Sequence, residues 1–288
     1  MKSYLDIVRH ILANGVRKQN RTGIDTLSVS GIMFEHDMAH GFPLLTTKKM
    51  PFKTIRVELE GFIKGITDKE WYQERGCKIW DEWCNPKKVA YGHAEETKAQ
   101  MKAERDLGAI YGFQWRHFNA PYVNFNSDYT NQGIDQLAKM IETIRKNPGD
   151  RRMIVMAWNP NALSEQALPP CHYSFQILVT EGKIDLLWNQ RSVDTMLGLP
   201  FNIASYATLL HLLAKETGLG EGKLIGFLAD THIYINQVDG AKLQLEREPK
   251  ALPHIITDPF TSMNEWTWEQ TRLEGYESHE KIEFPIAV

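Results

Sequence analysis

The sequence predicts a single α+β domain, in which helices and strands occur together in one chain. Three observations lead to this prediction. In several segments apolar residues recur at helical spacing, and in others they alternate as in half-buried strands. No Pro-, Gly- or Ser-rich linker and no internal repeat divides the chain. Its 288 residues can form one large domain with a substantial core.

The first third of the chain predicts helices around one strand. Residues 3–13 have apolar side chains at helical spacing, with Ser3 at the N-cap, and residues 26–37 alternate like a strand. Residues 52–64 form a predicted helix whose apolar stripe consists of Ile55, Leu59, Phe62 and Ile63. A Lys/Glu/Ala-rich stretch, residues 86–106, predicts a solvated helix at the periphery.

The middle of the chain predicts a helix at 133–147 and a strand from Met153, which follows Arg151 and Arg152. After two prolines comes Cys171, at the start of an alternating run in which Tyr173, Phe175, Ile177 and Val179 share one side. A Thr-Glu-Gly-Lys turn then predicts a hairpin that returns Arg191 to the side of Cys171. A cation beside a thiol favours the nucleophilic thiolate. The alternative is a buried structural cysteine.

The last third predicts a long, mostly buried helix from Asn202 to Gly218. Asn202 stands where an N-cap would, but its amide could equally pair with a base that presents N–H beside C=O, as uracil does. A strand at 223–237 places His232 and Tyr234 on one face, as partners for a sugar hydroxyl or as ordinary strand polar residues. A helix over 236–248 and further strand and loop segments complete the chain.

Composition excludes several classes of protein. The net charge is −3, whereas general nucleic-acid binding requires a basic surface. No apolar run approaches the length of a membrane span, and the first residues lack a signal-peptide core. The cysteines Cys77, Cys84 and Cys171 have neither zinc-ligand nor disulfide-framework spacing. We therefore expect a reduced, cytoplasmic protein without a bound metal and without membrane contacts.

Four motifs together resemble a known family. LPPCH at 168–172, QRSVD at 190–194, LGLPFNIASYA at 197–207 and DTHIY at 230–234 are similar, in order and spacing, to the motifs of thymidylate synthases. The similarity runs from Arg21 to the C-terminal Pro-Ile-Ala-Val. It implies one catalytic domain over residues 1–288, with 86–106 as a peripheral insertion. It further implies a large mixed or antiparallel sheet flanked by helices, with one sheet face packed in a twofold dimer.

The resemblance also implies a reaction. Such an enzyme is a methyltransferase that converts dUMP to dTMP with 5,10-methylenetetrahydrofolate as carbon and hydride donor, and it releases dihydrofolate. Adding the Cys171 thiolate to C6 of uracil makes C5 nucleophilic by way of an enolate. Glu58 borders the apolar stripe of its predicted helix, where a carboxylate is either paired structurally or tuned by burial for proton transfer. The resemblance makes it the general acid/base.

The remaining site residues are assigned by the same resemblance. Those implied for catalysis are Cys171, Glu58, Tyr111, Asn202, Arg191 and Asp194. Those implied for the nucleotide are Arg21, Arg151, Arg152, Arg191, Ser192, Asp194, Asn202, His232 and Tyr234, with Arg151 and Arg152 supplied by the partner subunit. Those implied for the folate are Ile79, Trp80, Asp194, Leu197, Gly198, Phe201 and Ala287, the last in a tail that excludes water. Without the family, Arg21 and the Arg151–Arg152 pair would be ordinary surface residues, and Tyr111 would equally be a buried hydroxyl satisfied by a neighbour.

The chain departs from the family at two places. Pro51 replaces a histidine near the folate tail, and Glu60-Gly61 replaces a stretch that often contains an aromatic residue. Gly61 costs about 1 kcal/mol of helix stability relative to alanine, so we expect packing to compensate.

The alternatives in function are a deoxyuridylate hydroxymethylase of the same superfamily and a nucleotide binder without catalysis. A cysteine hydrolase is disfavoured, because neighbouring strand residues such as Cys171 and His172 face opposite ways.

Overall fold

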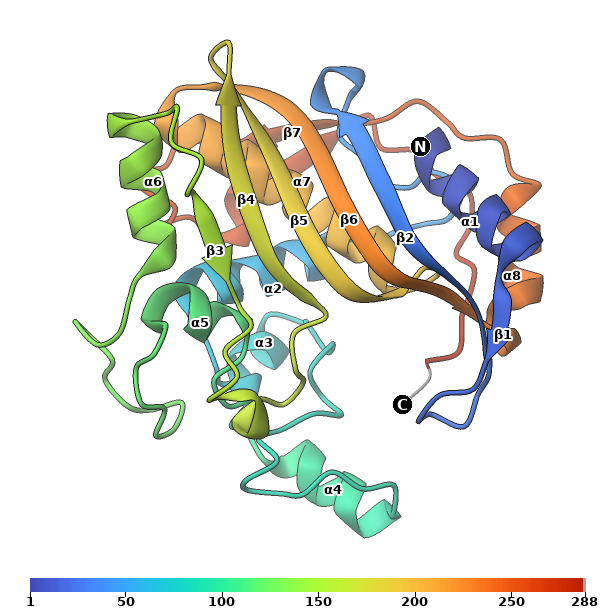
Figure 1. The fold of residues 1–288 in the computed structure, drawn as a ribbon, viewed down its shortest axis with the longest axis horizontal. Coiled ribbons are helices and arrows are strands. Elements are labelled where there is room, and N and C mark those ends of the chain that lie inside the picture. The colour runs from blue at the N-terminus through green and yellow to red at the C-terminus, as the bar shows by residue number, and fades with distance from the viewer. Residues whose placement is uncertain (287–288) are drawn as a thin grey trace.

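A six-stranded mixed sheet lies at the centre of the computed structural model, which describes residues 1–286 (Figure 1). The strands lie in the order β1-β2-β6-β5-β4-β3, and among the described strands only β5 and β6 run parallel. They are β1 (Val16–Lys18), β2 (Thr26–Asp37), β3 (Ile154–Met156), β4 (His172–Thr180), β5 (Lys183–Asp194) and β6 (Gly220–Tyr234). A separate pair joins β7 (His254–Thr257) and β8 (Thr271–Glu274). The predicted α+β domain with a mixed sheet is confirmed.

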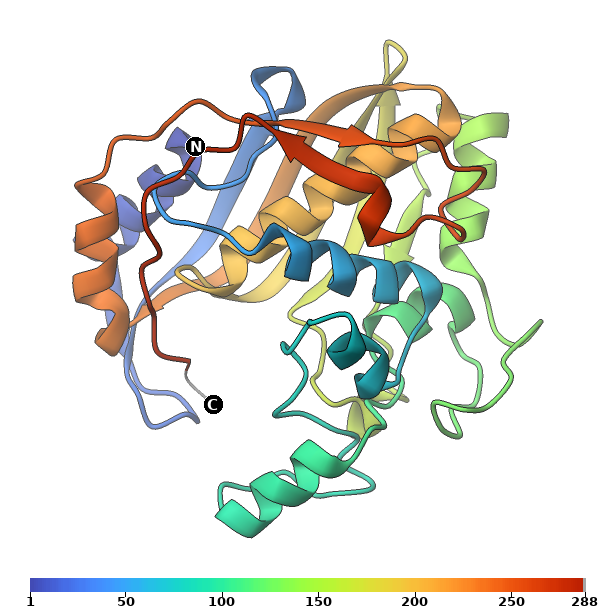
Figure 2. The same cartoon turned by 180° about the vertical axis from the view of Figure 1, so that it is seen from behind.

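The longest helix of the described chain covers one face of this sheet. Figure 2 shows α7 lying along the sheet, with α2 outside it. Residues of α7 from Leu199 to Ala214 are buried almost without interruption, as expected for a helix between two layers. The helices are α1 (Lys2–Asn14), α2 (Phe52–Lys64), α3 (Lys69–Glu74), α4 (Glu95–Ala103), α5 (Tyr111–His117), α6 (Gln136–Lys146), α7 (Gly198–Thr217) and α8 (Val238–Leu245).

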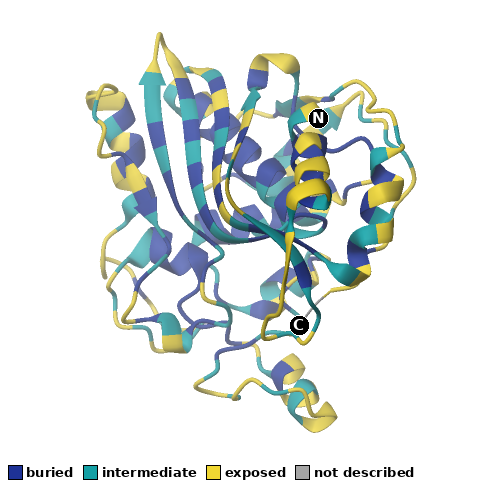
Figure 3. Ribbon diagram, turned by 45° about the vertical axis from the view of Figure 1, so that its right-hand side comes forward, coloured by how far each residue is buried: buried dark blue, intermediate teal, exposed yellow. Residues whose placement is uncertain are grey.

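The other face of the sheet exposes large apolar side chains (Figure 3). Met33 of β2 and Phe227 of β6 are paired neighbours and are 59% and 44% exposed. Ile154 of β3, the strand at the opposite edge of the sheet, is 46% exposed. Leu224 and Leu228, which alternate with Phe227, are buried beneath α7. One sheet face therefore forms the core, and the other carries exposed apolar side chains together with charged ones such as the Lys223–Glu35 pair.

Gly61 of helix α2 lies in close contact with the side chain of Tyr72. A Cβ atom at Gly61 would lie 2.3 Å from the ring of Tyr72, which is fully buried and donates a hydrogen bond to the Ile66 carbonyl. The ring occupies the space that any side chain would need. The expected compensation by packing is thus present, and the predicted bounds of α2 are confirmed.

Several predicted helix bounds are wrong. Helix α6 covers Gln136–Lys146 rather than 133–147, and α8 covers Val238–Leu245 rather than 236–248. Only Glu95–Ala103 of the 86–106 stretch is helical, as α4.

Helix α1 begins at Lys2, so Ser3 is not its N-cap. Helix α7 begins at Gly198 rather than Asn202, because Pro200 falls in its first turn, where a fixed φ and a missing N–H are tolerated. Oδ1 of Asp194 accepts hydrogen bonds from the amides of Met196 and Leu197 just before that turn. The N-cap interpretation of Asn202 is therefore excluded.

Two features of the sheet also differ from the sequence-based expectation. Strand β1 lies in a polar stretch and has every residue exposed, so it lacks an apolar pattern. In β4 a bulge between His172 and Ser174 breaks the alternation. The rings of His172 and Phe175 both pack against Tyr206 of α7, at 5.4 and 5.9 Å between centroids. His172, rather than the predicted Tyr173, therefore shares the buried face with Phe175.

Candidate active site

A cavity of about 660 Å³ surrounds the side chain of Cys171. Its walls come from the loop before β2, the segment after α3, the segment leading to Cys171, and the ends of β5 and β6. Six residues of the sequence-based assignment line it: Arg21, Cys171, Arg191, Ser192, His232 and Tyr234. Long-range strand pairing brings these distant parts of the chain together.

The backbone around Cys171 is held on both sides. Its N–H donates to the Tyr111 hydroxyl at 2.8 Å, and its carbonyl accepts from the Arg191 N–H at 2.8 Å. The Arg191 guanidinium donates to the carbonyls of Pro169 and Pro170, each at 2.9 Å, and Nη2 lies 3.9 Å from Sγ. The prolines therefore provide acceptors that fix the cation beside the sulfur.

Burial, and not the cation, decides the ionisation of this thiol. Burial raises the pKa of Cys171 above its ordinary value, while Arg191 and Arg21 oppose the rise. The expectation that Arg191 favours the thiolate is met in direction, but its effect is smaller than that of burial. A bound substrate would therefore contact a thiol whose ionisation is favoured by the Arg191 and Arg21 guanidinium groups and opposed by burial.

The polar end of the cavity suits an anion on a sugar. The loop carrying Arg21 is shaped by Asn20, whose Oδ1 accepts hydrogen bonds from the N–H and hydroxyl of Thr22. His232 packs edge-on against Tyr234, with 5.2 Å between ring centroids, and its Nδ1 lies 3.2 Å from Oδ1 of Asp230. Two guanidinium groups and several hydroxyls can bind phosphate and ribose oxygens.

A relay of amides sets the orientation of Asn202. The indole N–H of Trp188 can only donate, and it bonds to Oε1 of Gln190 at 3.1 Å. The Gln190 amide nitrogen therefore faces Asn202 and donates to its Oδ1 at 3.0 Å. Nδ2 of Asn202 donates no hydrogen bond to any residue within 1–286, although Asn202 is not part of the cavity lining. Gln190, which orients Asn202, was not among the residues assigned from the sequence.

Asp194 connects the start of α7 to the C-terminal segment. Its Oδ2 accepts a hydrogen bond from Nε2 of Gln237 at 3.3 Å, and the same nitrogen donates to the Pro285 carbonyl at 3.1 Å. Gln237 is 1% exposed. It holds the described end of the tail against Asp194, a link that no motif in the sequence indicated.

An aromatic cluster encloses Tyr111, and the partly buried Glu58 lies beside its Trp80 member. The Tyr111 ring stacks between Phe62 and His172, at 4.9 and 4.5 Å between centroids, and Trp80 lies 6.1 Å away. Burial raises the pKa of Glu58 to about 7, and the Trp80 side chain opposes this rise. Glu58 can therefore both hold and release a proton near neutral pH.

The adjacent histidine is held as a neutral group. Burial lowers the pKa of His172 to about 3, and its Nδ1 lies 2.9 Å from the Tyr206 hydroxyl. It faces α7 and the aromatic cluster. A neutral, buried imidazole with one nitrogen already occupied is poorly suited to act as the base of a hydrolase.

Other assigned residues lie outside this cavity in the single chain. Arg151 and Arg152 are exposed just before β3, and Arg152 is paired with Asp150 at 2.7 Å. The assigned folate residues within 1–286 are not part of the cavity lining: Ile79, Trp80, Asp194, Leu197, Gly198 and Phe201. Ala287 lies outside the described residues.

The cavity has aromatic walls that sequence reasoning did not assign. Trp158 lies under the Arg191 guanidinium, 5.6 Å from ring centroid to Cζ, and Tyr91 of the 86–106 segment also lines the cavity. Gln166 lines it too; its Oε1 is buried and accepts no hydrogen bond within the described chain. Only their proximity in the folded chain marks these residues, because none belongs to a recognisable motif.

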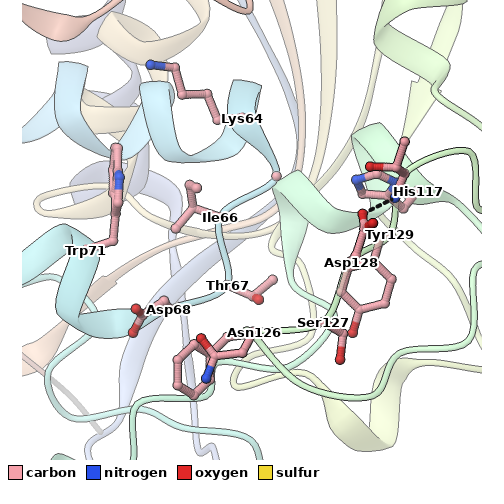
Figure 4. Close-up of a pocket in the computed structure, with 13 residues that line it drawn as sticks. Lys64, Ile66, Thr67, Asp68, Trp71, His117, Asn126, Ser127, Asp128 and Tyr129 are labelled. Carbon is pink, nitrogen blue, oxygen red and sulfur yellow. Dashed lines mark hydrogen bonds between the residues drawn. The ribbon is translucent and has the colours of Figure 1, made fainter.

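A second hollow, of about 380 Å³, lies between α2, α3 and the 125–130 loop (Figure 4). Lys64 pairs with Glu60 and Asp68 with Arg105, while Asp128 accepts a hydrogen bond from the Thr130 N–H at 2.8 Å. No thiol lines it. Among residues 1–286, no three His, Cys, Asp or Glu side chains are grouped as a metal site. No helix in that part of the chain is long and apolar enough to cross a membrane.

Comparison with known proteins gives a consistent picture. Residues 2–288 match the family model described as thymidylate synthase. The chain is 44% identical to thymidylate synthase of Homo sapiens over 286 residues, which cover 99% of this chain and 90% of that protein. It is 43% identical over 285 residues to a bifunctional dihydrofolate reductase-thymidylate synthase of Paramecium tetraurelia. That match covers 99% of this chain and 61% of the longer protein.

Proposed function

The chain belongs to the thymidylate synthase family, and we propose that it catalyses the reductive methylation of dUMP to dTMP. 5,10-Methylenetetrahydrofolate supplies both the carbon and the hydride and leaves as dihydrofolate. The observation that carries this proposal is the cavity around Cys171, in which a nucleophile lies beside two guanidinium groups and sugar-binding side chains. No metal takes part in the proposed reaction.

Cys171 is the proposed nucleophile. Its thiolate adds to C6 of the uracil ring, and the electron pair of the C5–C6 bond moves into an enolate at O4. C5 then attacks the one-carbon unit of the folate. Loss of the C5 proton expels the folate nitrogen from the one-carbon unit and leaves an exocyclic methylene on C5. Hydride from the released tetrahydrofolate then adds to this methylene, which gives the methyl group and dihydrofolate. The electron pair returns to the C5–C6 bond as the Cys171 thiolate leaves C6. The two fixed cations Arg191 and Arg21 support thiolate formation against the effect of burial.

Glu58 and Tyr111 are the proposed proton-transfer groups. A carboxyl whose pKa is about 7 holds a proton for O4 or the folate and can take it back within one turnover. The Tyr111 hydroxyl already meets the backbone of the nucleophile at 2.8 Å, so it lies close to the C5–C6 edge of a bound ring.

The nucleotide is proposed to lie along the polar end of the cavity. Its phosphate is held by Arg21, Arg191 and Ser192, and its sugar by His232 and Tyr234. The remaining contacts are assigned by the family pattern. Asn202 reads the uracil edge, with its amide oriented by the relay from Trp188, and Arg151 and Arg152 of the partner subunit complete the phosphate site.

The folate is proposed to lie beside the start of α7. Its assigned contacts are Ile79, Trp80, Asp194, Leu197, Gly198, Phe201 and Ala287. The hydrogen bonds of Gln237 to Asp194 and to the Pro285 carbonyl support a tail that closes over this ligand. Closure excludes water, which would otherwise compete with hydride and give a hydroxymethyl product.

A homodimer is proposed through the open sheet face. The exposed apolar residues Met33, Phe227 and Ile154 form a surface of the kind that subunits bury. Arg151 lies at its margin, where its carbonyl accepts from Gln176 of β4. Phe227→Lys should convert the dimer to a monomer in sedimentation, with loss of activity. A monomeric but fully active wild type would reject this arrangement.

Three free cysteines fit the proposed cytoplasmic location.

The decisive experiment is turnover with defined substrates. Purified protein is incubated with dUMP and 5,10-methylenetetrahydrofolate, dihydrofolate absorbance is followed, and the nucleotide is identified by mass. We expect dTMP and dihydrofolate in equal amounts, and neither with Cys171→Ser. Hydroxymethyl-dUMP with tetrahydrofolate would instead identify a hydroxymethylase. Tight dUMP binding without any product would identify a non-catalytic binder.

A further inference from the structure

The 86–106 segment reaches the active-site cavity as well as the periphery. It leaves the body after Asn85 and returns at Asp106, where the Asn85 N–H donates to the Asp106 carbonyl at 2.7 Å. Helix α4 projects from the molecule in both views of the ribbon. Residues 86–94, which precede α4 and which we name the arm, run back along the cavity wall, with Pro86 and Tyr91 in its lining.

The 86–106 segment is anchored at three places. The 1% exposed Lys69 donates from Nζ to the Met101 carbonyl at 2.7 Å, near the end of α4. Lys88 pairs with the fully buried Asp106 at 2.9 Å. Lys87 pairs at 2.7 Å with Glu165, which ends the short 3-10 helix η2 (Leu163–Glu165) six residues before Cys171. Of these three contacts, the Lys87–Glu165 pair joins the arm to the segment that carries the nucleophile.

Tyr91 presents a flat ring at the rim of the cavity. It is 42% exposed and lies nearly parallel to Trp83, with 5.6 Å between ring centroids and 10° between planes. His93 packs edge-on against the same ring, at 5.2 Å and 83°. These two contacts restrict the Tyr91 ring, so less side-chain freedom is lost when a ligand binds. Because Tyr91 is stacked on Trp83, it supports the indole at the cavity wall.

Cations and aromatic rings line the same cavity. Its lining includes Arg21 and Arg191, which suit an anion, and the rings of Trp83 and Tyr91. The backbone N–H of Trp83 donates to the carbonyl of Trp80, a residue assigned to the folate, at 3.0 Å. Flat aromatic faces favour flat rings. The wall formed by Trp83 and Tyr91 therefore adjoins the site proposed for the cosubstrate.

We infer that Tyr91 is a positioning residue for the cosubstrate. It holds Trp83 and forms the outer wall against which the aromatic part of the folate packs. This inference rests on the proposed function, because it takes the folate as the second ligand. It assigns to the 86–106 segment a direct effect on folate affinity.

The test separates folate affinity from nucleotide affinity and from folding. Tyr91→Ala, Tyr91→Phe and the control Glu96→Ala, on the exposed face of α4, are compared with the wild type. We expect Tyr91→Ala to raise KM for 5,10-methylenetetrahydrofolate roughly three- to tenfold, the range of one aromatic pair. KM for dUMP and kcat should change less than twofold. Tyr91→Phe keeps the ring and should behave as wild type, as should Glu96→Ala.

A second readout does not depend on turnover. Folic acid is titrated into the dUMP-loaded protein, and quenching of tryptophan fluorescence is followed. Tyr91→Ala should weaken this binding by the same factor, so the inference can be judged even if the wild type forms no dTMP. Unchanged folate binding in Tyr91→Ala, or an equal rise in both KM values, would overturn it. So would a Tyr91→Phe variant as impaired as Tyr91→Ala.

Discussion

Replacing Glu58 by glutamine tests the electrostatics of the site through stability. Burial raises the pKa of Glu58 to about 7 from an ordinary 4.5. Between these values the native protein keeps a proton that the unfolded chain has lost. The free energy of unfolding therefore falls as the pH rises through this window and stays low above it. At about 1.36 kcal/mol for each pH unit, the penalty above pH 7 is about 3 kcal/mol.

The glutamine variant cannot ionise and escapes this penalty. Relative to the wild type, Glu58→Gln should have a similar free energy of unfolding at pH 4.5 and a value about 3 kcal/mol higher at pH 8. Urea unfolding followed by tryptophan fluorescence at four pH values measures the difference, with the exposed Glu96→Gln as a control that changes little. A difference between the two proteins that is independent of pH would refute the reasoning.

The activity of the same variant gives the second half of the test. Without a carboxyl to exchange protons, dTMP formation should fall by roughly 10²–10⁴-fold. A variant that is more stable but inactive would show that the raised pKa of Glu58 lowers the stability of the protein and is required for its activity. A variant that is more stable and fully active would remove Glu58 from proton transfer.

Three further substitutions have defined outcomes. Gly61→Ala should lower the free energy of unfolding by about 1–3 kcal/mol, because the new methyl group would lie 2.3 Å from the Tyr72 ring. Helix propensity alone predicts a more stable variant. An increase in stability measured by urea denaturation would therefore contradict this packing. Lys88→Met should cost about 1–3 kcal/mol by leaving the buried Asp106 carboxylate unpaired, and an unchanged unfolding midpoint would show that water replaces the ammonium. Gln190→Leu should raise KM for dUMP about tenfold and weaken rejection of dCMP, because the base-reading amide loses its orientation. Equal nucleotide selectivity in that variant would show that the relay has no such role.

Elements with strong local periodicity could be predicted from the sequence. The strand at 26–37 and the helix at 52–64 match the structure at both ends. The hairpin between β4 and β5 turns at Glu181-Gly182, as its short turn sequence indicates. A period of 2 or 3.6 residues is visible in a short window and needs no knowledge of distant partners.

Other elements depended on contacts that no window contains. Strand β1 forms because its edge pairs with β2, and its own residues are all exposed. The start of α7 was wrongly placed because Pro200 interrupts a helix interior but fits a first turn. The bulge in β4 turns His172 toward Tyr206, and only the packing of α7 against the sheet selects that arrangement.

Local motifs were enough to predict which chemistry this chain should perform. The order and spacing of its motifs identify the family, and the hairpin placed Arg191 beside Cys171. The tertiary structure decided how that chemistry is tuned. The direction of the Cys171 pKa, the proton affinity of Glu58, the orientation of Asn202 and the approach of Tyr91 to Trp83 all depend on burial and on partners far away in sequence. Burial and orientation are properties of the packed chain, because a residue acquires them only when remote segments remove its water and fix its neighbours.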